Sequence, residues 1–182
     1  LQNKGMNQWV ICPKNSRLAA FCIQHQIPHT LFKKNGGFDP ILAFKVTKLC
    51  RQFAKPIIHA HDSHAHTSAV LAGTIWMNKA PIVLHRRVSF QISNNPLSRF
   101  KYTYHQIKRI LCVSQSVKQT IDSQFNRPGI TKVIYSAIDL KKFENIPNQN
   151  FLRQQYDIEP KCQIIGNISA LTKEKDLYTF ID

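Results

Sequence analysis

The chain has 182 residues, of which 43% are hydrophobic, 25 are lysine or arginine and 10 are aspartate or glutamate. Its length suits one domain, or one domain and part of a second, at roughly 100–200 residues per domain. No apolar run approaches the ~20 residues that span a bilayer, and the opening LQNKGMNQWV does not have the pattern of a signal peptide. The five cysteines are scattered without a CxxC pair, which favours reduced core thiols in a cytosolic protein over disulfides or zinc ligands.

The formal net charge of +15 is compatible with three classes of partner: nucleic acid, an anionic membrane surface and phosphorylated substrates. Charge alone does not choose among them, and a solvated basic surface is the simplest explanation. The basic residues are spread along the chain in pairs such as Lys33-Lys34 and Arg86-Arg87. Because no block of five or six basic residues occurs, a basic tail is not expected.

Short apolar runs alternate with helix-period segments along the first 135 residues. Strands are expected to start near residues 9, 29, 57, 81, 110 and 132. Helices are expected at 17–26, 40–54, 97–108 and 115–125, and in the second part of 56–77. This alternation predicts an α/β fold, a Rossmann-like parallel sheet with helices on both faces. Residues 1–7 look like the end of a helix, so a first strand is expected upstream of residue 1.

The pattern changes after Tyr135. Residues 140–143 are expected to form one helical turn that closes a first domain of residues 1–143, and residues 144–160 are expected to be a linker. Residues 161–182 are then the first strand–helix unit of a second Rossmann-like domain, with a strand at 162–168 and a helix at 173–182. So short a unit cannot bury a core of its own. We therefore expect a chain that is truncated at both ends.

The stretch 56–77 has the strongest functional pattern. A short apolar strand, beginning at Ile57, is followed at once by the polar residues His59, His61, Asp62, Ser63, His64 and His66, and then by a helix. This turn lies at the carboxyl end of a parallel strand, where ligands bind in open α/β sheets. Either Asp62 or Ser63 is a suitable N-cap, and the helix start would favour an anion. We expect this turn to form the floor of an active-site cleft.

The four histidines of this stretch are not expected to converge on one zinc ion. His59 and His61 are two residues apart and point to the same side of an extended strand. His64 and His66 lie about 200° apart around a helix, and we expect them to be exposed or capping. An HxH pair also occurs in metal-dependent amidohydrolase barrels. That alternative needs further histidines and an aspartate on later strands, and the later strands offer only His85.

Two further features lie close to this turn in the predicted sheet. Arg86 and Arg87 follow the next strand at the same carboxyl edge, where they would either hold an acidic or phosphorylated acceptor or form ion pairs with the few acids. Ser114 stands at a strand end and helix start without a GxSxG frame, so a helix cap is favoured over a nucleophile.

Five segments in order carry a resemblance to a known family. They are KPIIHAHDSHAH (55–66), PIVLHRRVSF (81–90), RILCVSQSVKQTI (109–121), KVIYSAIDLKKF (132–143) and IIGNISALTKEKDLYTFID (164–182). Each motif alone is weak, but their order and spacing over nearly the whole chain resemble the bacterial glycosyltransferases of family 4. Enzymes of that family have the two-domain GT-B fold, so the resemblance implies a GT-B amino-terminal domain followed by the start of the carboxyl-terminal domain.

The resemblance implies transfer of a sugar from a nucleotide-sugar donor to a glycan or lipid-linked acceptor, with retention and without metal or cofactor. Residues 1–143 would bind the acceptor, and residues 161–182 would begin the nucleotide-sugar domain. His61 matches the family's histidine near the transferred sugar, and Lys175 matches the lysine that faces the donor diphosphate. The acceptor would meet five residues of the carboxyl edge: His59, Asp62, Ser63, Arg86 and Arg87. Positive groups and helix ends suit the departing diphosphate, and Lys175 near the start of the predicted helix 173–182 offers both.

The sequence also departs from the family pattern. Ala170 replaces an arginine, Asp176 replaces a glycine and Ala137 replaces the glycine of a GID stretch. The ALTKEKD form is similar to that of lipopolysaccharide-type enzymes, which implies a role in cell-envelope polysaccharide or lipopolysaccharide synthesis. The distal acidic motif that contacts the donor sugar is absent from this sequence. We therefore expect the chain to be inactive alone.

Localisation and rival functions complete the expectations. The aromatic residues Phe100, Tyr102 and Tyr104 alternate with basic residues, which would suit nucleic acid or a lipid headgroup region. We favour peripheral association of a cytoplasmic enzyme with the anionic inner face of the plasma membrane, and expect no nucleic-acid partner. The alternatives are a metal-dependent hydrolase, which tightly bound zinc or manganese would support, and a basic nucleic-acid-binding module, which steeply salt-dependent binding would support.

Overall fold

The structure is a computed structural model that describes residues 5–34, 36–88, 90–127, 129–144 and 150–181. It divides into two compact units, Leu1–Ala137 and Ile138–Asp182. The helical end expected at residues 1–7 falls largely outside the described residues, as does the first part of the expected linker, residues 145–149. No helix in the described ranges is long and apolar enough to cross a membrane.

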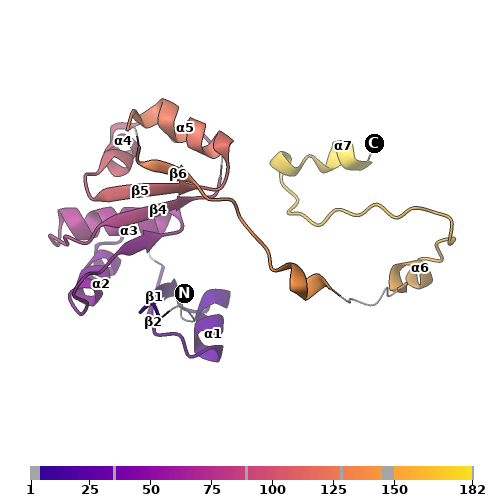
Figure 1. The fold of residues 1–182 in the computed structure, drawn as a ribbon, viewed down its shortest axis with the longest axis horizontal. Helices are drawn as coiled ribbons and strands as arrows, with labels where there is room; N and C mark the ends of the chain where they lie inside the picture. The colour runs from indigo at the N-terminus through magenta and orange to yellow at the C-terminus, as the bar shows by residue number, and fades with distance from the viewer. Residues whose placement is uncertain (1–4, 35, 89, 128, 145–149, 182) are drawn as a thin grey trace. The chain divides into compact units, whose positions relative to one another are not determined.

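The first unit is built on parallel strands, as the sequence predicted. Its strands are β1 (Val10–Pro13), β2 (His29–Phe32), β3 (Ile58–Ala60), β4 (Ile82–Arg86), β5 (Ile107–Cys112) and β6 (Thr131–Val133). All paired strands are parallel, and each strand starts within three residues of the expected position. The strands form two sheets instead of one, with the orders β1-β2 and β3-β4-β5-β6 (Figure 1).

Each helix of the first unit begins at a polar capping residue. The helices are α1 (Arg17–Gln24), α2 (Pro40–Cys50), α3 (Ser63–Thr74), α4 (Pro96–Thr103) and α5 (Gln115–Phe125). The caps are Ser16, Asp39, Asp62, Asn95 and Ser114, and each side chain accepts a hydrogen bond from the backbone N–H three residues later. Such bonds satisfy amide groups that a helix start leaves unpaired. The prediction that Ser114 is a cap is confirmed.

The boundary between α4 and β5 differs from the prediction. The expected helix 97–108 ends at Thr103, and β5 begins at Ile107 instead of near residue 110. The chain turns here because Tyr104 and Ile107 are both buried in the core, 6% and 1% exposed. The guanidinium of Arg127 also donates to the backbone oxygens of Tyr104 and Ile107, at 3.4 and 3.3 Å. The helix α4 therefore ends earlier than predicted, because the Tyr104 and Ile107 side chains are both buried in the core.

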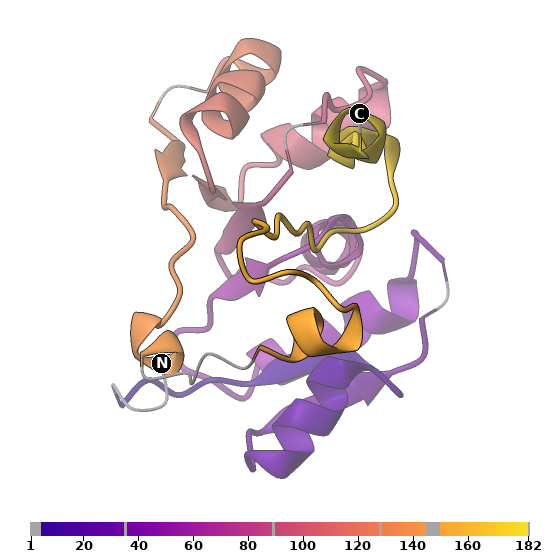
Figure 2. The ribbon, with the colours of Figure 1, turned by 90° about the vertical axis from the view of Figure 1, so that its right-hand side faces the viewer.

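Side chains alternate between the two faces of the four-stranded sheet, as extended strands require. One face carries Ala60, Ile82, Leu84, Ile110 and Cys112, all buried in a core to which α3, α4 and α5 also contribute (Figure 1; Figure 2 gives the same ribbon after a quarter turn). A second, smaller core joins α2 to α3 and β2.

The opposite face of this sheet is more polar, with two histidines and an arginine beside Val83. His59 in β3 is paired in register with Val83 in β4, and Val83 with Arg109 in β5. His59 and Arg109 are exposed, whereas Val83 and His85 are half-buried. Histidine side chains therefore lie at the carboxyl ends of β3 and β4, on the face of the sheet opposite the core.

The second unit contains short helical segments: a 3-10 helix η2 (Leu140–Phe143), α6 (Phe151–Gln155), a 3-10 helix η3 (Lys173–Lys175) and α7 (Leu177–Ile181). The helical turn expected at 140–143 is confirmed. The expected strand 162–168 is wrong, since these residues have no strand structure and Ile165 and Ile168 are exposed. The expected helix 173–182 is interrupted at Asp176, which has a left-handed backbone with φ 43°. A strand is stabilised by neighbours in a sheet, and the described part of this unit supplies none.

Candidate functional site

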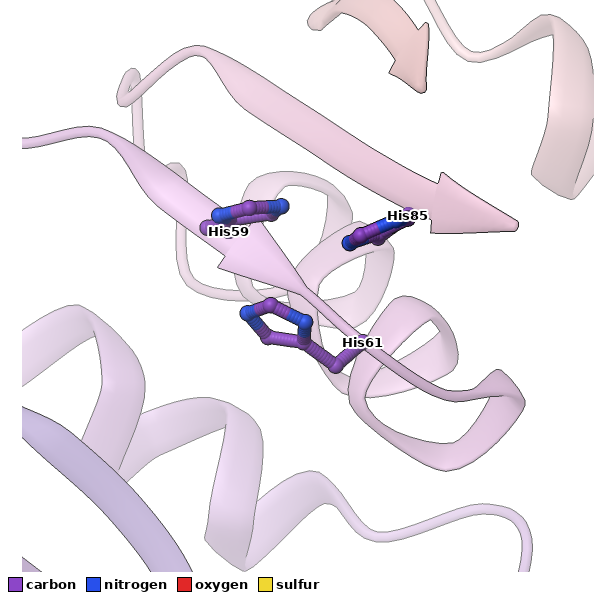
Figure 3. Close-up of side chains that lie close together, drawn as sticks. All are labelled: His59, His61 and His85. Carbon is purple, nitrogen blue, oxygen red and sulfur yellow. The ribbon is translucent and has the colours of Figure 1, made fainter. Parts of the chain in front are cut away.

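Three histidines meet at the carboxyl edge of the four-stranded sheet. His59 lies in β3, His61 follows directly after β3, and His85 lies in β4. Because His59 pairs in register with Val83, and Ala60 with Leu84, the next positions along the two strands are His61 and His85. All three side chains therefore lie on the polar face, as Figure 3 shows. We call His59, His61 and His85 the histidine cluster.

The rings of the histidine cluster are in close contact. Ring centroids are 4.1 Å apart for His59 and His61, 5.8 Å for His59 and His85, and 5.6 Å for His61 and His85. One ring nitrogen from each histidine lies within 4.8 Å of the other two. The prediction that His59 and His61 share a side is confirmed. The contribution of His85 was missed, although its place at the end of the next strand was the signal for it.

The three imidazoles are held in the uncharged form at neutral pH. Partial removal of the His59 ring from water, followed by the charges of the nearby His61 and His85, together lower the pKa of His59 to about 4. Burial also lowers the pKa of His61, with a contribution from the charge of Arg87. The pKa of His85 is lowered by burial, by His61 and by Arg87. Each neutral ring has one N–H donor and one lone pair, so the cluster can both donate and accept hydrogen bonds.

The two arginines at the end of β4 lie on different sides of the sheet. Arg87 is exposed, and its charge acts on His61 and His85. Arg86 alternates to the core face, where its guanidinium donates to the Tyr102 hydroxyl at 3.1 Å and to the Phe90 carbonyl oxygen. The structure thus brings Arg87 to the histidine cluster but directs the Arg86 guanidinium away from it.

Asp62 and Ser63 link the cluster to the start of α3. One carboxylate oxygen of Asp62 accepts the Ala65 N–H at 2.7 Å, so this side chain is the helix cap. The Ser63 hydroxyl oxygen accepts from the ammonium of Lys101 at 3.0 Å. Lys101 was expected only as a basic residue of the aromatic run, because it is distant along the chain and the packing of α4 beside α3 brings it here. Both Asp62 and Ser63 are exposed at the carboxyl edge.

The prediction that His64 and His66 are exposed or capping is wrong. His66 is 3% exposed, and its Nε2–H donates to the Lys101 carbonyl oxygen at 2.9 Å. Burial, followed by the charge of Lys101, lowers its pKa to about 3. His64 is half-buried and stacks on Phe32 with ring centroids 5.9 Å apart. Both histidines point into the packing around α3, because the helix turns those positions away from the sheet edge.

The aromatic run that suggested a membrane contact is mostly core. Tyr102 and Tyr104 are each 6% exposed, whereas Phe100 is 49% exposed. Tyr102 stacks on Phe125 with ring centroids 4.9 Å apart, and Tyr104 packs against Phe100. A surface formed by all three rings is therefore ruled out.

Lys175 lies in the second unit. It is the last residue of the three-residue 3-10 helix η3, and its side chain is exposed. The longer helix whose amino-terminal end was expected near Lys175 is not formed. Two features of Lys175 were expected to serve the donor diphosphate: its ammonium and a nearby helix start. Among the described residues of this unit, the structure retains the ammonium but not the start of a longer helix.

A parallel α/β sheet flanked by helices is a Rossmann-like fold, and polar side chains gather at the carboxyl edge of this one, where ligands of that fold class bind. The family model of Glycosyltransferase Family 4 matches residues 1–142. The chain therefore belongs to glycosyltransferase family 4. Among curated proteins, none has a sequence that matches it significantly.

Solved structures of HepE from Anabaena resemble this chain. The structure in complex with UDP has 18% sequence identity and a TM-score of 0.58, and the match covers 82% of this chain and 50% of that one. The structure in complex with UDP-glucose has 17% identity and a TM-score of 0.55, with the same coverage. At this identity the likeness shows the fold, which is that of a GT-B protein. The chain spans about half the length of these structures.

Proposed function

We propose that this chain is the acceptor-binding part of a sugar transferase. The enzyme moves a sugar from a nucleotide-sugar to a glycan or lipid-linked acceptor with retention, in the synthesis of cell-envelope polysaccharide or lipopolysaccharide. Membership of glycosyltransferase family 4 supports sugar transfer. The observation that carries the proposal within the chain is the histidine cluster beside Arg87, at the edge of the sheet where ligands of this fold class bind.

In this proposal His61 is the catalytic residue next to the transferred sugar. A neutral imidazole with a free N–H or lone pair can bond a sugar hydroxyl, and its lowered pKa keeps it neutral at physiological pH. His59 and Ser63 line the acceptor site with it. Arg87 supplies a positive charge for an acidic or phosphorylated acceptor, since guanidinium groups bind phosphate and carboxylate well.

Asp62 and Arg86 belong to the same proposed site, but hydrogen bonds within the protein already occupy part of each side chain. Asp62 has one oxygen engaged in the helix cap, so its second oxygen is the one that an acceptor hydroxyl would meet. Arg86 is bonded to Tyr102 and Phe90, so it acts by holding the end of β4 in place.

A uridine nucleotide-sugar is the first donor to test. HepE has been solved with UDP and with UDP-glucose. In our proposal Lys175 faces the donor diphosphate, where an ammonium stabilises the charge that develops on the leaving group. Association with an anionic membrane surface on the cytoplasmic side belongs to the same proposal. It is supported by the net charge of +15 and would be seen as salt-sensitive co-sedimentation with anionic vesicles.

A metal-dependent hydrolase is the second candidate, because His85 supplies one of the further histidines that this alternative needs beside the HxH pair. The metal-ligand group found among the described residues contains no carboxylate, and Asp62 caps α3 instead. Because the chain belongs to a glycosyltransferase family, we favour the transferase over this hydrolase.

The test uses the intact natural protein. Its thermal stability is recorded with a panel of nucleotide-sugars in EDTA, and sugar transfer is compared between the wild type, His61→Ala and His105→Ala. A donor that stabilises the protein without metal, with kcat lowered about 100-fold or more in His61→Ala alone, supports the proposal. If no donor stabilises the protein and hydrolysis appears only with added zinc or manganese, the transferase proposal is wrong and the hydrolase replaces it.

A further inference from the structure

The histidine cluster has the ligand number and arrangement of a metal site. His59 lies in β3, His61 is the first residue after β3, and His85 lies in β4 at the position beside His61. Parallel pairing of β3 and β4 fixes His59 and His85 relative to one another, and it places His61 directly after the last paired residue of β3. A site built on paired strands holds its side chains more firmly than one built on loops.

The spacing of the ring nitrogens is close to what a metal needs. Zinc binds histidine nitrogens at about 2.0–2.1 Å, so two nitrogens on a tetrahedral ion stand roughly 3.3 Å apart. The three nitrogens of the cluster already lie within 4.8 Å of one another. His61 stands just beyond the end of β3, so rotation of its side chain can supply the remaining approach. The His85 Nε2 atom is enclosed and has no hydrogen-bond partner among the described residues, which leaves it available as a ligand.

The chemistry of the cluster selects a class of ion. Imidazole groups suit zinc, copper and nickel, whereas magnesium and calcium prefer oxygen ligands. The metal-ligand group found in the described part of the chain consists of histidines alone. Three protein ligands leave a fourth position open to water or an anion. Arg87 stands close enough to act on His61 and His85, so its positive charge opposes a bound cation.

We propose that His59, His61 and His85 bind one transition-metal ion, with zinc as the first candidate and a fourth position open to solvent. This site is independent of the proposed sugar transfer, because it rests on the geometry of three side chains. If both proposals hold, zinc occupies the imidazole of His61 and inhibits transfer, so the metal would be a regulator of the enzyme instead of its cofactor.

Cobalt and zinc titrations of the 182-residue chain test the site. Cobalt(II) replaces zinc and gives intense visible absorption in tetrahedral sites, and a competing chromophoric chelator gives the zinc affinity. We expect one ion per chain, a tetrahedral cobalt spectrum without a thiolate-to-cobalt band, and no binding of magnesium. The thiolate band separates this site from one formed by the cysteines.

Four variants locate the ion. His59→Ala and His85→Ala should each weaken zinc binding more than about tenfold. His105→Ala, which removes an exposed histidine outside the cluster, should leave it unchanged. Arg87→Gln should tighten binding about two- to tenfold, since it removes a nearby positive charge. Circular dichroism of each variant checks the fold, and the opposite response of Arg87→Gln cannot come from unfolding.

The proposal is overturned if the wild type takes up no stoichiometric zinc or cobalt. It is also overturned if His85→Ala and His59→Ala bind zinc as tightly as the wild type. Neither outcome bears on sugar transfer in EDTA, so failure of the metal site and failure of the proposed enzyme are distinguishable.

Discussion

The buried imidazole of His66 should make the first unit lose stability in mild acid. Its Nε2–H donates to the Lys101 carbonyl oxygen, its ring stands edge-on to Tyr102 with centroids 4.8 Å apart, and Lys101 and Arg86 add positive charge nearby. A proton on this ring would introduce an uncompensated buried charge. The folded pKa is therefore about 3, against about 6.5 in the unfolded chain.

The sign and size of the effect follow from proton linkage. Between these two pKa values the unfolded chain binds more protons than the folded chain, so the stability is full above about pH 6.5 and is lost as pH falls toward 3. For the change from pH 7 to pH 5 the difference is about 2 kcal/mol. His66→Gln keeps an N–H donor for the Lys101 carbonyl and removes the titration. We expect the wild type to lose about 2 kcal/mol more than His66→Gln over this interval.

Urea unfolding at pH 7, 6 and 5, followed by tryptophan fluorescence, measures this difference. Both tryptophans, Trp9 and Trp76, lie in the first unit and report on it. The other histidines with lowered pKa values contribute equally to both proteins and cancel in the comparison. An NMR titration of the His66 ring supplies a second measurement. Equal losses of stability in the two proteins, or a ring titration near pH 6.5, would refute the reasoning.

Three further predictions concern a packed glycine, a half-buried arginine and a helix cap. Gly73→Ala should destabilise the chain by about 1–2 kcal/mol in urea unfolding, because the added methyl group would overlap the buried Tyr104 hydroxyl. This cost should exceed the gain in helix propensity from alanine. The control Gly37→Ala, whose added methyl group would meet nothing within 4 Å, should be near neutral. Arg127→Gln should cost about 1–3 kcal/mol through the carbonyl oxygens that it leaves unpaired, and a loss no greater than that of an exposed arginine would contradict this. Asp62→Ala should cost about 1 kcal/mol and Asp62→Asn much less, so a higher acceptor KM in Asp62→Asn at unchanged stability would assign the carboxylate to the acceptor as well as to the cap.

The parallel α/β fold was predictable because its signals are local. A cap such as Ser114 and a proline such as Pro40 mark helix starts by their own chemistry, and short apolar runs mark strands that are buried on at least one face. The early end of α4 was not predictable, because it depends on the burial of both Tyr104 and Ile107 in the core. The expected strand 162–168 failed for a related reason: its apolar pattern is genuine, but strand pairing is decided by neighbours.

The candidate site also has features that the sequence predicts and features that depend on packing between distant segments. That His59 and His61 share a side follows from the period of a strand and was predicted. The addition of His85 depends on the register between β3 and β4. The separation of Arg86 from Arg87 depends on β4 extending through Arg86, which places consecutive side chains on opposite faces. His66 was misjudged because burial of a helix position is set by the packing of α3 against α4, which no short stretch of sequence specifies.

Side chains alternate along β3 and β4, so one strand register sets both the position of the histidine cluster and the position of the core residues. His59 and His61 flank the buried Ala60, and His85 follows the buried Leu84. Insertion or deletion of a single residue in β3 would turn the imidazoles toward α3 and bring an alanine to the surface. A one-residue change in length within this segment would therefore remove the ligand groups and open the core together, whereas a substitution leaves the register unchanged.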